Sequence, residues 1–505
     1  MSLQKHIKGT HPKGESPELS ISNDFQNVSL DTYGGKIHVE IDEDIKTTPI
    51  GAFAFFVDFL KSSGLLEEWI EECPLFYTSN NAPKKRDILG TALLSVLSGH
   101  KRYAHSTTLR SDSVNPELLS MSKIVSEDSL RRGLSRIDED AGWCWQQGNN
   151  LKTLGPLLEQ KWILDIDTTI KPIYGHQEGA EISYNPHKPG RPSHTYHTYI
   201  MSGTRLVLDS EVRPGSEHGP SHTRPELWRF IDKLTPSQRP ELLRGDAAFG
   251  SEETMCWPEQ NNLGYLFKLR QHKNVKRLIE ELNSTAEWES AGKGWEGSES
   301  TLRLTSWTKS RRVVVLRREV GRIKSKQEAK VFELLGGEII IQETPIYEHM
   351  VLVTNLEFGI MELGQLYRDR ADCENVFDEL KNQWGWGGFT TKDLKRCQIM
   401  ARIVVQVYNW WSIFTHTIDQ GHHHEAQTTR PLILANVAKL AVSGGKKLLR
   451  ISAKGSKAKI ISFFAKICER VRAIIRSAEQ LDGKSGWTNV LTWIYNPSPP
   501  TLSFG

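Results

Sequence analysis

Short apolar segments alternate with helical ones after residue 160, and this alternation restricts the architecture of the chain. Strand-like patterns occur at residues 161–167, 195–201, 205–212, 241–246 and 264–270. A helical pattern at 225–234 lies between them, and strands that alternate with helices are typical of an α/β core. Residues 287–355 contain further β-type segments, and helical spacing returns at 361–384 and 394–418. We therefore predict an α/β core that is interrupted by a β-strand-rich insertion.

The region before this core has the spacing of helices. Apolar residues recur at helical intervals in 50–72 and 87–99. Ser126 is a candidate N-cap for a short helix that carries Arg131 and Arg132. This basic helix indicates either a helix-turn-helix-like reader of DNA or a solvated helix face.

The region after the core is strongly basic. Residues 430–484 contain thirteen Lys and Arg but three acidic residues, whereas the whole chain has a formal net charge of +3. Lys and Arg alternate with apolar residues at helical spacing, which predicts an amphipathic helix at 458–480. We expect its charged face to be available to DNA.

The composition excludes several classes of protein. No segment approaches the roughly 18 unbroken apolar residues of a membrane helix, and residues 1–17 lack the apolar centre of a signal peptide. The six cysteines are scattered singly, so neither a zinc knuckle nor a disulfide framework is expected. We expect no membrane association and a cytoplasmic location.

Two of the predicted strands end in carboxylates. Asp165 and Asp167 alternate along the first strand and therefore share one face, while Leu164 and Ile166 point into the core. Asp246 ends a later strand, at the edge where open α/β sheets place their sites. Each Asp taken alone also fits an ordinary turn residue. A carboxylate at the end of an apolar strand usually has a partner, and a hard divalent cation is one option for it.

A later helical segment carries four polar residues on one stripe. At about 100° per residue, Tyr367, Arg370, Glu374 and Lys381 lie close together on a single helix face. Ordinary pairing between residues four apart explains Arg370 with Glu374 but not the other two. The stripe therefore predicts one wall of a site.

These residues resemble a known group of enzymes. Tyr-x2-Arg-x3-Glu-x6-Lys resembles the signature around the catalytic Glu of one branch of DDE insertion-sequence transposases. Asp246-Ala-Ala-Phe resembles the second motif of that branch, and Asp167-Thr-Thr resembles its first. Residues 174–194, 213–219 and 125–134 are most similar to the insertion-sequence family numbered thirteen-eighty. The resemblance covers roughly residues 85–410.

The resemblance implies an RNase H-like catalytic core in which Asp167, Asp246 and Glu374 hold two Mg²⁺ ions, with Mn²⁺ as a substitute. Asp165 remains an alternative ligand because it shares a strand face with Asp167. The further residues expected to contact DNA are Tyr367, Arg370 and Lys381 at the DNA end, Lys188 and Arg191 in the loop after the first strand, and Arg131 and Arg132.

The implied activity is cut-and-paste DNA transposition. Such an enzyme binds the terminal inverted repeats of its element as double-stranded DNA, cleaves both strands, with a hairpin intermediate expected, and joins the 3′ ends to target DNA. It acts as a homodimer because two ends must be synapsed, and its location is the bacterial cytoplasm, at the nucleoid. The alternatives are a domesticated non-catalytic DNA-binding protein and a two-metal nuclease without strand transfer.

A chain of 505 residues is long enough for several domains. The predicted regions are a flexible polar arm (1–45), an α-helical N-terminal DNA-binding region (46–158), the first part of the core (159–286), the β-rich insertion (287–355), the second part of the core with the catalytic Glu helix (356–420) and a basic helical C-terminal region (421–505).

Overall fold

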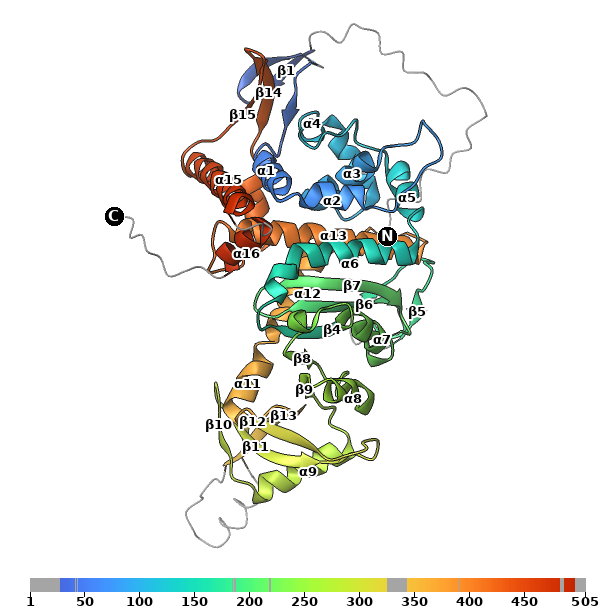
Figure 1. Cartoon of the computed structure of the whole chain (residues 1–505), viewed down its shortest axis with the longest axis vertical. Coiled ribbons are helices and arrows are strands. Elements are labelled where there is room, and N and C mark those ends of the chain that lie inside the picture. Colours follow the sequence, from blue (N-terminus) through green and yellow to red (C-terminus); the bar gives the residue numbers. More distant parts are fainter. Residues whose placement is uncertain are drawn as a thin grey trace, which may run out of the picture.

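One mixed sheet runs through the middle and lower parts of the computed structural model (Figure 1). The structure describes residues 28–495 except 41, 43, 184, 186–187, 218, 325–342, 390 and 482–485. The ten strands are β4 (Ile163–Pro172), β5 (Glu181–Ile182), β6 (Pro192–Met201), β7 (Leu206–Pro214), β8 (Leu242–Gly245), β9 (Gly264–Lys268), β10 (Glu289–Gly292), β11 (Trp295–Leu302), β12 (Arg311–Lys324) and β13 (Glu343–Thr354).

The strand order explains how distant segments meet. It is β10-β11-β12-β13-β9-β8-β4-β6-β5, with β7 also paired to β6. β8 lies between β4 and β9 and runs parallel to both, and the other pairs are antiparallel. All the strand segments predicted between residues 161 and 270 are present. β13 pairs directly with β9, with Leu352 opposite Lys268, so β10–β13 extend the same sheet.

Helices before and after the sheet strands pack together. Those from the N-terminal part are α1 (Phe53–Ser63), α2 (Leu65–Glu71), α3 (Lys85–Leu97), the 3-10 helix η1 (Tyr103–Ser111), α4 (Asn115–Leu118), α5 (Glu127–Ser135) and α6 (Glu139–Leu158). Those between the strands are α7 (Pro220–Ile231), η2 (Pro236–Gln238), α8 (Glu252–Gln260) and α9 (Lys273–Thr285). Those after the strands are α11 (Ile360–Arg368), α12 (Ala371–Gln383), α13 (Leu394–His416), α14 (Ala426–Thr429), the π-helical turn η3 (Arg430–Leu434), α15 (Ser456–Leu481) and α16 (Gly486–Tyr495).

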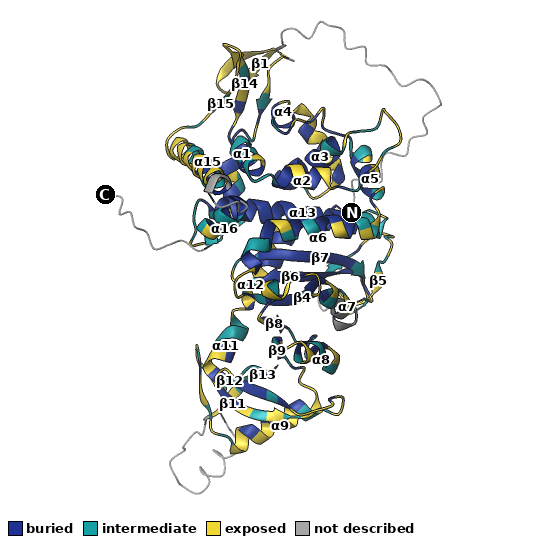
Figure 2. Cartoon of the chain, in the orientation of Figure 1, coloured by how far each residue is buried: buried dark blue, intermediate teal, exposed yellow. Residues whose placement is uncertain are grey.

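The long helix α13 is the centre of the helical packing. It lies beside α6 and against β7, and it is buried along most of its length (Figures 1 and 2). Trp410 of α13 meets Trp69 edge to face at 5.5 Å, and Trp69 stacks on Trp145 of α6 at 5.3 Å. These aromatic contacts join three segments that are far apart in the sequence, so this tryptophan-rich part of the chain forms core.

Buried charges fix α13 on the sheet. Arg402 lies between two carboxylates of β7, with its Nε 3.2 Å from Asp209 Oδ1 and its Nη2 3.4 Å from Glu211 Oε1. Asn409 of α13 accepts the N–H of Val207, two residues before Asp209 in β7, at 3.0 Å. A buried charge is costly unless it is paired, so these partners restrict where the helix can lie.

Both ends of the described chain differ from the prediction. The region predicted to be a flexible arm contains a hairpin of β1 (Val28–Thr32) and β2 (Gly35–Val39), while residues 1–27 lie outside the described residues. The C-terminal region predicted to be helical contains β14 (Ala438–Ser443) and β15 (Lys446–Ile451), which form a three-stranded sheet with β3 (Thr47–Thr48). Gly444 and Gly445 have positive φ angles of 57° and 71°, which a two-residue hairpin turn requires.

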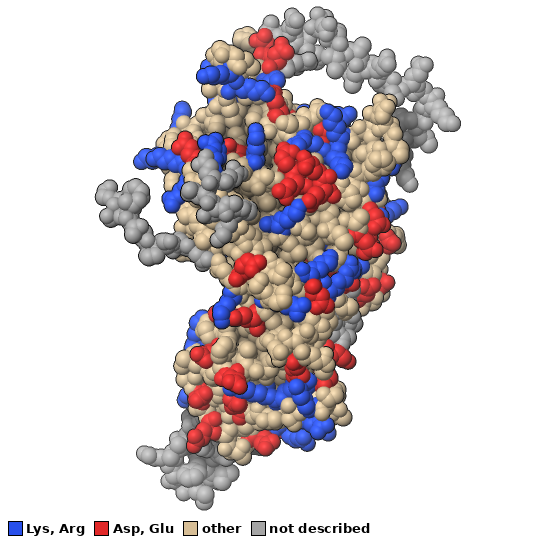
Figure 3. Space-filling model, in the orientation of Figure 1, with Lys and Arg blue, Asp and Glu red and all other residues tan. Residues whose placement is uncertain are grey.

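Charge is not uniformly mixed over the molecule. The amphipathic helix predicted at 458–480 is confirmed as α15, and its outer side is exposed (Figure 2). Figure 3 shows Lys and Arg side chains over α15 and the β14–β15 hairpin, with some Asp and Glu side chains beside them, and both signs are interspersed lower on the same face. Among the described residues, no helix is both long and apolar enough to cross a bilayer.

Candidate active site

Two carboxylates meet where parallel strands β4 and β8 end their pairing. The register pairs Asp165 with Arg244 and Ile166 with Gly245. One residue further along each segment lie Asp167 and Asp246, so the two side chains leave the sheet at the same place. Because residues two apart in a strand share a face, Asp167 is on the same face as Asp165.

Asp165 is occupied by a buried partner. Arg244 binds it through two parallel hydrogen bonds, Nε to Oδ1 at 2.6 Å and Nη2 to Oδ2 at 2.7 Å. Both side chains are 1% exposed. The Arg244 guanidinium also donates to Ser202 Oγ at 2.5 Å and to the Leu366 carbonyl. This pair therefore ties β4 and β8 to the end of α11.

Asp167 lies closer to solvent, with its side chain 14% exposed. Its Oδ1 accepts the Thr168 N–H at 2.7 Å, and its Oδ2 accepts Nη2 of Arg370 at 2.5 Å. Burial raises the pKa of Asp167 to about 6; Arg370 lowers this pKa and Asp246 raises it. A carboxylate whose charge is disfavoured by burial and by a second carboxylate gains from any added cation.

The helix with the predicted polar stripe is two helices. α11 ends at Arg368 and α12 begins at Ala371, and Asp369 and Arg370 lie between them. The N–H of Arg370 bonds to the Tyr367 carbonyl, three residues back, at 3.2 Å. The prediction of one continuous helix is therefore wrong, and the angular positions worked out for a single helix do not hold across this junction.

The junction nevertheless brings two of the four polar residues, Arg370 and Lys381, to strand β4. Arg370 contacts Asp167 directly, and Lys381 of α12 donates to the Thr169 hydroxyl of β4. Glu374 is exposed on the first turn of α12. Burial lowers the pKa of Lys381, and Asp167 raises it, so the ammonium lies within the field of that carboxylate.

The pKa of Tyr367 depends on three carboxylates. Burial raises the pKa of its phenol to about 12; Arg370 opposes this change, and Asp246, Asp167 and Glu374 add to it. One phenol therefore lies within the electrostatic reach of all three. Asp167, Asp246 and Arg370, which are far apart in the sequence, therefore form one group at the ends of β4 and β8, called here the Asp167 cluster.

The donor set suits hard divalent cations, which prefer carboxylate oxygens. In the described residues, however, no group of three or more His, Cys, Asp or Glu side chains is close enough to hold a metal ion. The Arg370 guanidinium lies against Asp167 Oδ2, where it supplies positive charge to this carboxylate. The chemistry of the ligands fits the metal, and Arg370 would have to share or release Asp167 for binding.

Comparison with known proteins identifies the family. A family model described as Transposase DDE domain group 1 matches residues 78–473. The chain belongs to this family. Among solved structures, the chain is similar to a piggyBac transposase in a synaptic complex with hairpin DNA, at 9% identity and a TM-score of 0.36, over 90% of this chain and 88% of that chain. No curated protein matches.

The loop after β4 carries a cationic cluster on the transposase surface. Lys188 and Arg191, both predicted to contact DNA, lie over the Tyr174 ring, each 4.9 Å from its centroid. Tyr174 is 67% exposed, and Lys188 also donates to its hydroxyl. Tyr174 was not predicted as a site residue, although an aromatic residue among Lys, Arg and Gly is a signal for nucleic-acid contact.

The predicted basic helix of the transposase is α5, and its charges are paired. Ser126 caps it, accepting the Ser129 N–H at 3.2 Å. Arg131 binds Asp128 at 2.8 Å, and Arg132 binds the same carboxylate at 3.3 Å. A DNA phosphate would therefore have to compete with Asp128 for Arg131 and Arg132.

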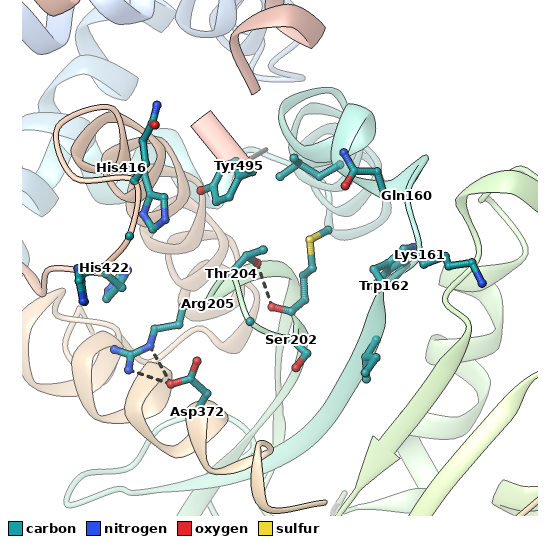
Figure 4. A pocket seen from close by; sticks show the side chains of 17 residues that line it. Gln160, Lys161, Trp162, Ser202, Thr204, Arg205, Asp372, His416, His422 and Tyr495 are labelled. Carbon is teal, nitrogen blue, oxygen red and sulfur yellow. Dashed lines mark hydrogen bonds and ion pairs between the residues drawn. The ribbon is translucent and has the colours of Figure 1, made fainter. Parts of the chain in front are cut away.

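A cavity of about 640 Å³ lies beside the first turn of α12. Figure 4 shows Arg205, from the turn between β6 and β7, reaching Asp372 across one wall. The Arg205 Nη2 is 2.8 Å from Asp372 Oδ1. His416 and Tyr495 also line this cavity; their rings stack at 4.9 Å, and burial lowers the pKa of His416 to about 4. The Arg205–Asp372 pair anchors the helix turn that carries the exposed Glu374 of the transposase.

Proposed function

We propose that this DDE transposase is a cut-and-paste enzyme of the insertion-sequence family numbered thirteen-eighty. It would bind the terminal inverted repeats of its element, cleave both strands through a hairpin intermediate and join the 3′ ends to target DNA. The observation that carries the proposal is that Asp167 and Asp246 follow the paired ends of the parallel strands β4 and β8, and that Arg370, directly before the helix α12 that carries Glu374, binds Asp167.

The strand arrangement supports an RNase H-like core. In chain order the core strands are β4, β6, β7, β8 and β9, and in space β7 pairs with β6, β6 with β4, β4 with β8 and β8 with β9. β6 is antiparallel to its two neighbours, β4 and β7, whereas β8 and β9 run parallel to β4. Strands β10–β13, between β9 and α11 in the sequence, would then be the insertion before the Glu helix.

The residue roles follow from position and charge. Asp167, Asp246 and Glu374 would hold two divalent ions, Mg²⁺ or Mn²⁺, which would activate the attacking oxygen and stabilise the leaving oxygen of the phosphodiester. Arg370 is bound to Asp167 by a charge-assisted bond, and its planar guanidinium also suits bidentate contact with a phosphate of the DNA end.

Two further residues of the same wall would position the DNA end. Lys381 lies beside β4, where its ammonium would neutralise a phosphate, and Tyr367 would offer its ring to a base. If Arg370 bound a phosphate of the DNA, it would no longer bind Asp167. Binding of the DNA end would therefore free the Asp167 carboxylate. Asp165 has no such role in this proposal because Arg244 occupies both of its oxygens.

The test uses a labelled repeat end, purified full-length protein and Mg²⁺. We expect the wild type to cleave at the repeat tip and Glu374→Gln to bind the same duplex without cleaving it. Asp378→Asn is the matched control, since Asp378 lies one turn further on the same exposed side of α12 and its carboxylate accepts from Asn382. Retained cleavage in Glu374→Gln, or equal loss in both variants, would contradict the assignment.

The products separate the proposed function from its alternatives. A transposase gives a hairpin on the excised end in a denaturing gel and strand-transfer products with a supercoiled target. Cleavage without transfer would indicate a nuclease, and binding without cleavage in both Mg²⁺ and Mn²⁺ would indicate a non-catalytic DNA-binding protein. A homodimer predicts one complex that contains two differently labelled ends.

A further inference from the structure

The β14–β15 hairpin has two unlike faces. On one face Ala438 and Leu440 are buried against the protein. Lys447, on the same face by strand alternation, binds Glu117 of α4 at 2.7 Å, and Glu117 also binds Lys46 at 2.8 Å. Hydrogen bonds from these two lysines lower the pKa of Glu117. The hairpin is therefore held in one orientation relative to the N-terminal helices.

The other face points to solvent and is cationic. The register places Lys439 directly opposite Arg450, and Ser443 opposite Lys446. All three basic side chains are exposed, and within the described part of the chain none of them forms an ion pair. Like charges directly opposite each other destabilise a strand pair. Binding of an anionic partner would therefore reduce the repulsion between the positive charges on this face.

The shape of the hairpin suits a groove of duplex DNA. The turn at Gly444 and Gly445 is two residues long, so the ribbon stays narrow to its tip. The strands are six residues each, which is about 20 Å at roughly 3.3 Å per residue. The major groove of B-DNA, about 12 Å wide, admits a two-stranded β-ribbon. The ribbon is thus long and narrow enough to follow the groove.

The cationic surface continues from the hairpin onto α15, which begins at Ser456 after a short connection. Lys459 and Lys466 are exposed on this helix and flank Phe463, which is 42% exposed. A shallow surface groove is lined by these three residues with Ala458 and Ser462. Figure 3 shows the basic side chains of the hairpin and of α15 on one side of the molecule.

We propose that the outward face of the β14–β15 hairpin is a duplex-DNA contact, in which Lys439, Lys446 and Arg450 bind phosphates on the walls of a groove. This inference rests on the proposed function, because it names a surface by which the transposase holds its DNA substrate. The hairpin is far from β4, the strand that carries Asp167, in Figure 1, so it would hold DNA away from the proposed cleavage point.

The experiment measures binding of a fluorescent repeat-end duplex by the full-length chain between low and moderate salt. Each neutralised phosphate contributes about 0.9 to the slope of log K against log salt. The triple variant Lys439→Gln/Lys446→Gln/Arg450→Gln is expected to bind more weakly, with a slope shallower by about 2 to 3. A wild-type slope in this variant, with its circular dichroism unchanged, would overturn the inference.

The matched control removes the same charge elsewhere. Lys273, Lys276 and Arg277 are exposed on α9, at the opposite end of the molecule (Figure 1). The control variant Lys273→Gln/Lys276→Gln/Arg277→Gln is expected to keep the wild-type slope. An equal loss of slope in the control would mean that net charge alone matters, and this would overturn the hairpin as a specific contact.

The wild-type reaction separates failure of the inference from failure of the proposed function. If the wild type binds and cleaves the repeat end but the hairpin variant keeps its slope, only the hairpin contact is wrong. If the wild type neither binds nor cleaves, the proposed function fails. If the hairpin charges change binding only of an RNA duplex or of polyglutamate, the assignment to DNA is wrong.

Discussion

Asp165 and Asp167 lie two residues apart in β4, yet their environments predict opposite consequences for the same substitution. Asp165 forms a bidentate pair with Arg244, and both side chains are 1% exposed. Asp165→Asn would leave a buried guanidinium without its counter-charge, which costs about 3–5 kcal/mol. Total stabilities are of the order of 5–15 kcal/mol, so this single change removes a large share.

The assay is urea denaturation followed by circular dichroism, with DNA cleavage measured under native conditions. Asp165→Asn is expected to lower the unfolding midpoint strongly. Asp246→Asn is the control, because the Asp246 carboxylate accepts one hydrogen bond, from the Ala248 N–H at 2.8 Å, and no ion pair to it is found in the described residues. This control is expected to shift stability by no more than about 1 kcal/mol while it abolishes cleavage.

A second variant tests the mechanism of the loss. Asp165→Leu/Arg244→Met removes both buried charges and replaces them with apolar side chains, which is often neutral or stabilising. We expect it to recover most of the stability that Asp165→Asn loses. A wild-type midpoint in Asp165→Asn together with loss of cleavage would refute this reasoning and would transfer the catalytic role proposed for Asp167 to Asp165.

Three further outcomes are expected from other parts of the molecule. Ser126→Ala removes the N-cap of α5 and should lower the unfolding free energy by about 1 kcal/mol in the same urea assay. Burial raises the pKa of Glu252, but hydrogen bonds from Arg311 and Thr308 lower it to about 2. Because the pKa is lower in the folded protein, Glu252 contributes up to about 3 kcal/mol of stability above its unfolded pKa near 4.5, and this contribution is lost as the pH falls towards 2. In Glu252→Gln the thermal unfolding midpoint should therefore fall less steeply with decreasing pH over this range than in the wild type. Chelation of divalent ions should abolish repeat-end cleavage and leave duplex binding within a few-fold, as measured by fluorescence anisotropy.

The core strands could be predicted from the sequence because local pattern determines them. Alternation in residues 161–167 places Leu164 and Ile166 inside, and both are fully buried. The same alternation places Asp165 and Asp167 on one face and cannot separate them. Their difference arises from Arg244, which is opposite Asp165 only after β4 and β8 have paired.

The junction at Asp369 and Arg370 had no local signal. The sequence around it contains neither Pro nor Gly, and both residues keep right-handed helical backbone angles. The separation of α11 from α12 coincides with a tertiary contact, the bond from Arg370 to Asp167, 203 residues away. Periodicity grouped the four polar residues on one helix face but could not identify this contact.

The β14–β15 hairpin did have a signal. Gly444-Gly445 between two alternating segments is typical of a tight hairpin. The many Lys and Arg residues across 430–484 were interpreted as one helical pattern, and the turn that the glycine pair indicates was therefore missed. Glycine pairs inside basic segments should be considered before helical spacing is assigned.

The pairing of β13 with β9 bears on how this chain could be shortened. Leu352, Val353 and Thr354 of β13 cover the outer edge of β9, and β12 and β11 continue the ladder beyond them. A chain lacking β10–β13 would expose the unpaired N–H and C=O groups of β9, whose Tyr265, Leu266 and Phe267 are now fully buried. An open, apolar edge strand is a template for intermolecular pairing. A minimal catalytic fragment would therefore aggregate unless that edge were given a substitute strand or charged residues.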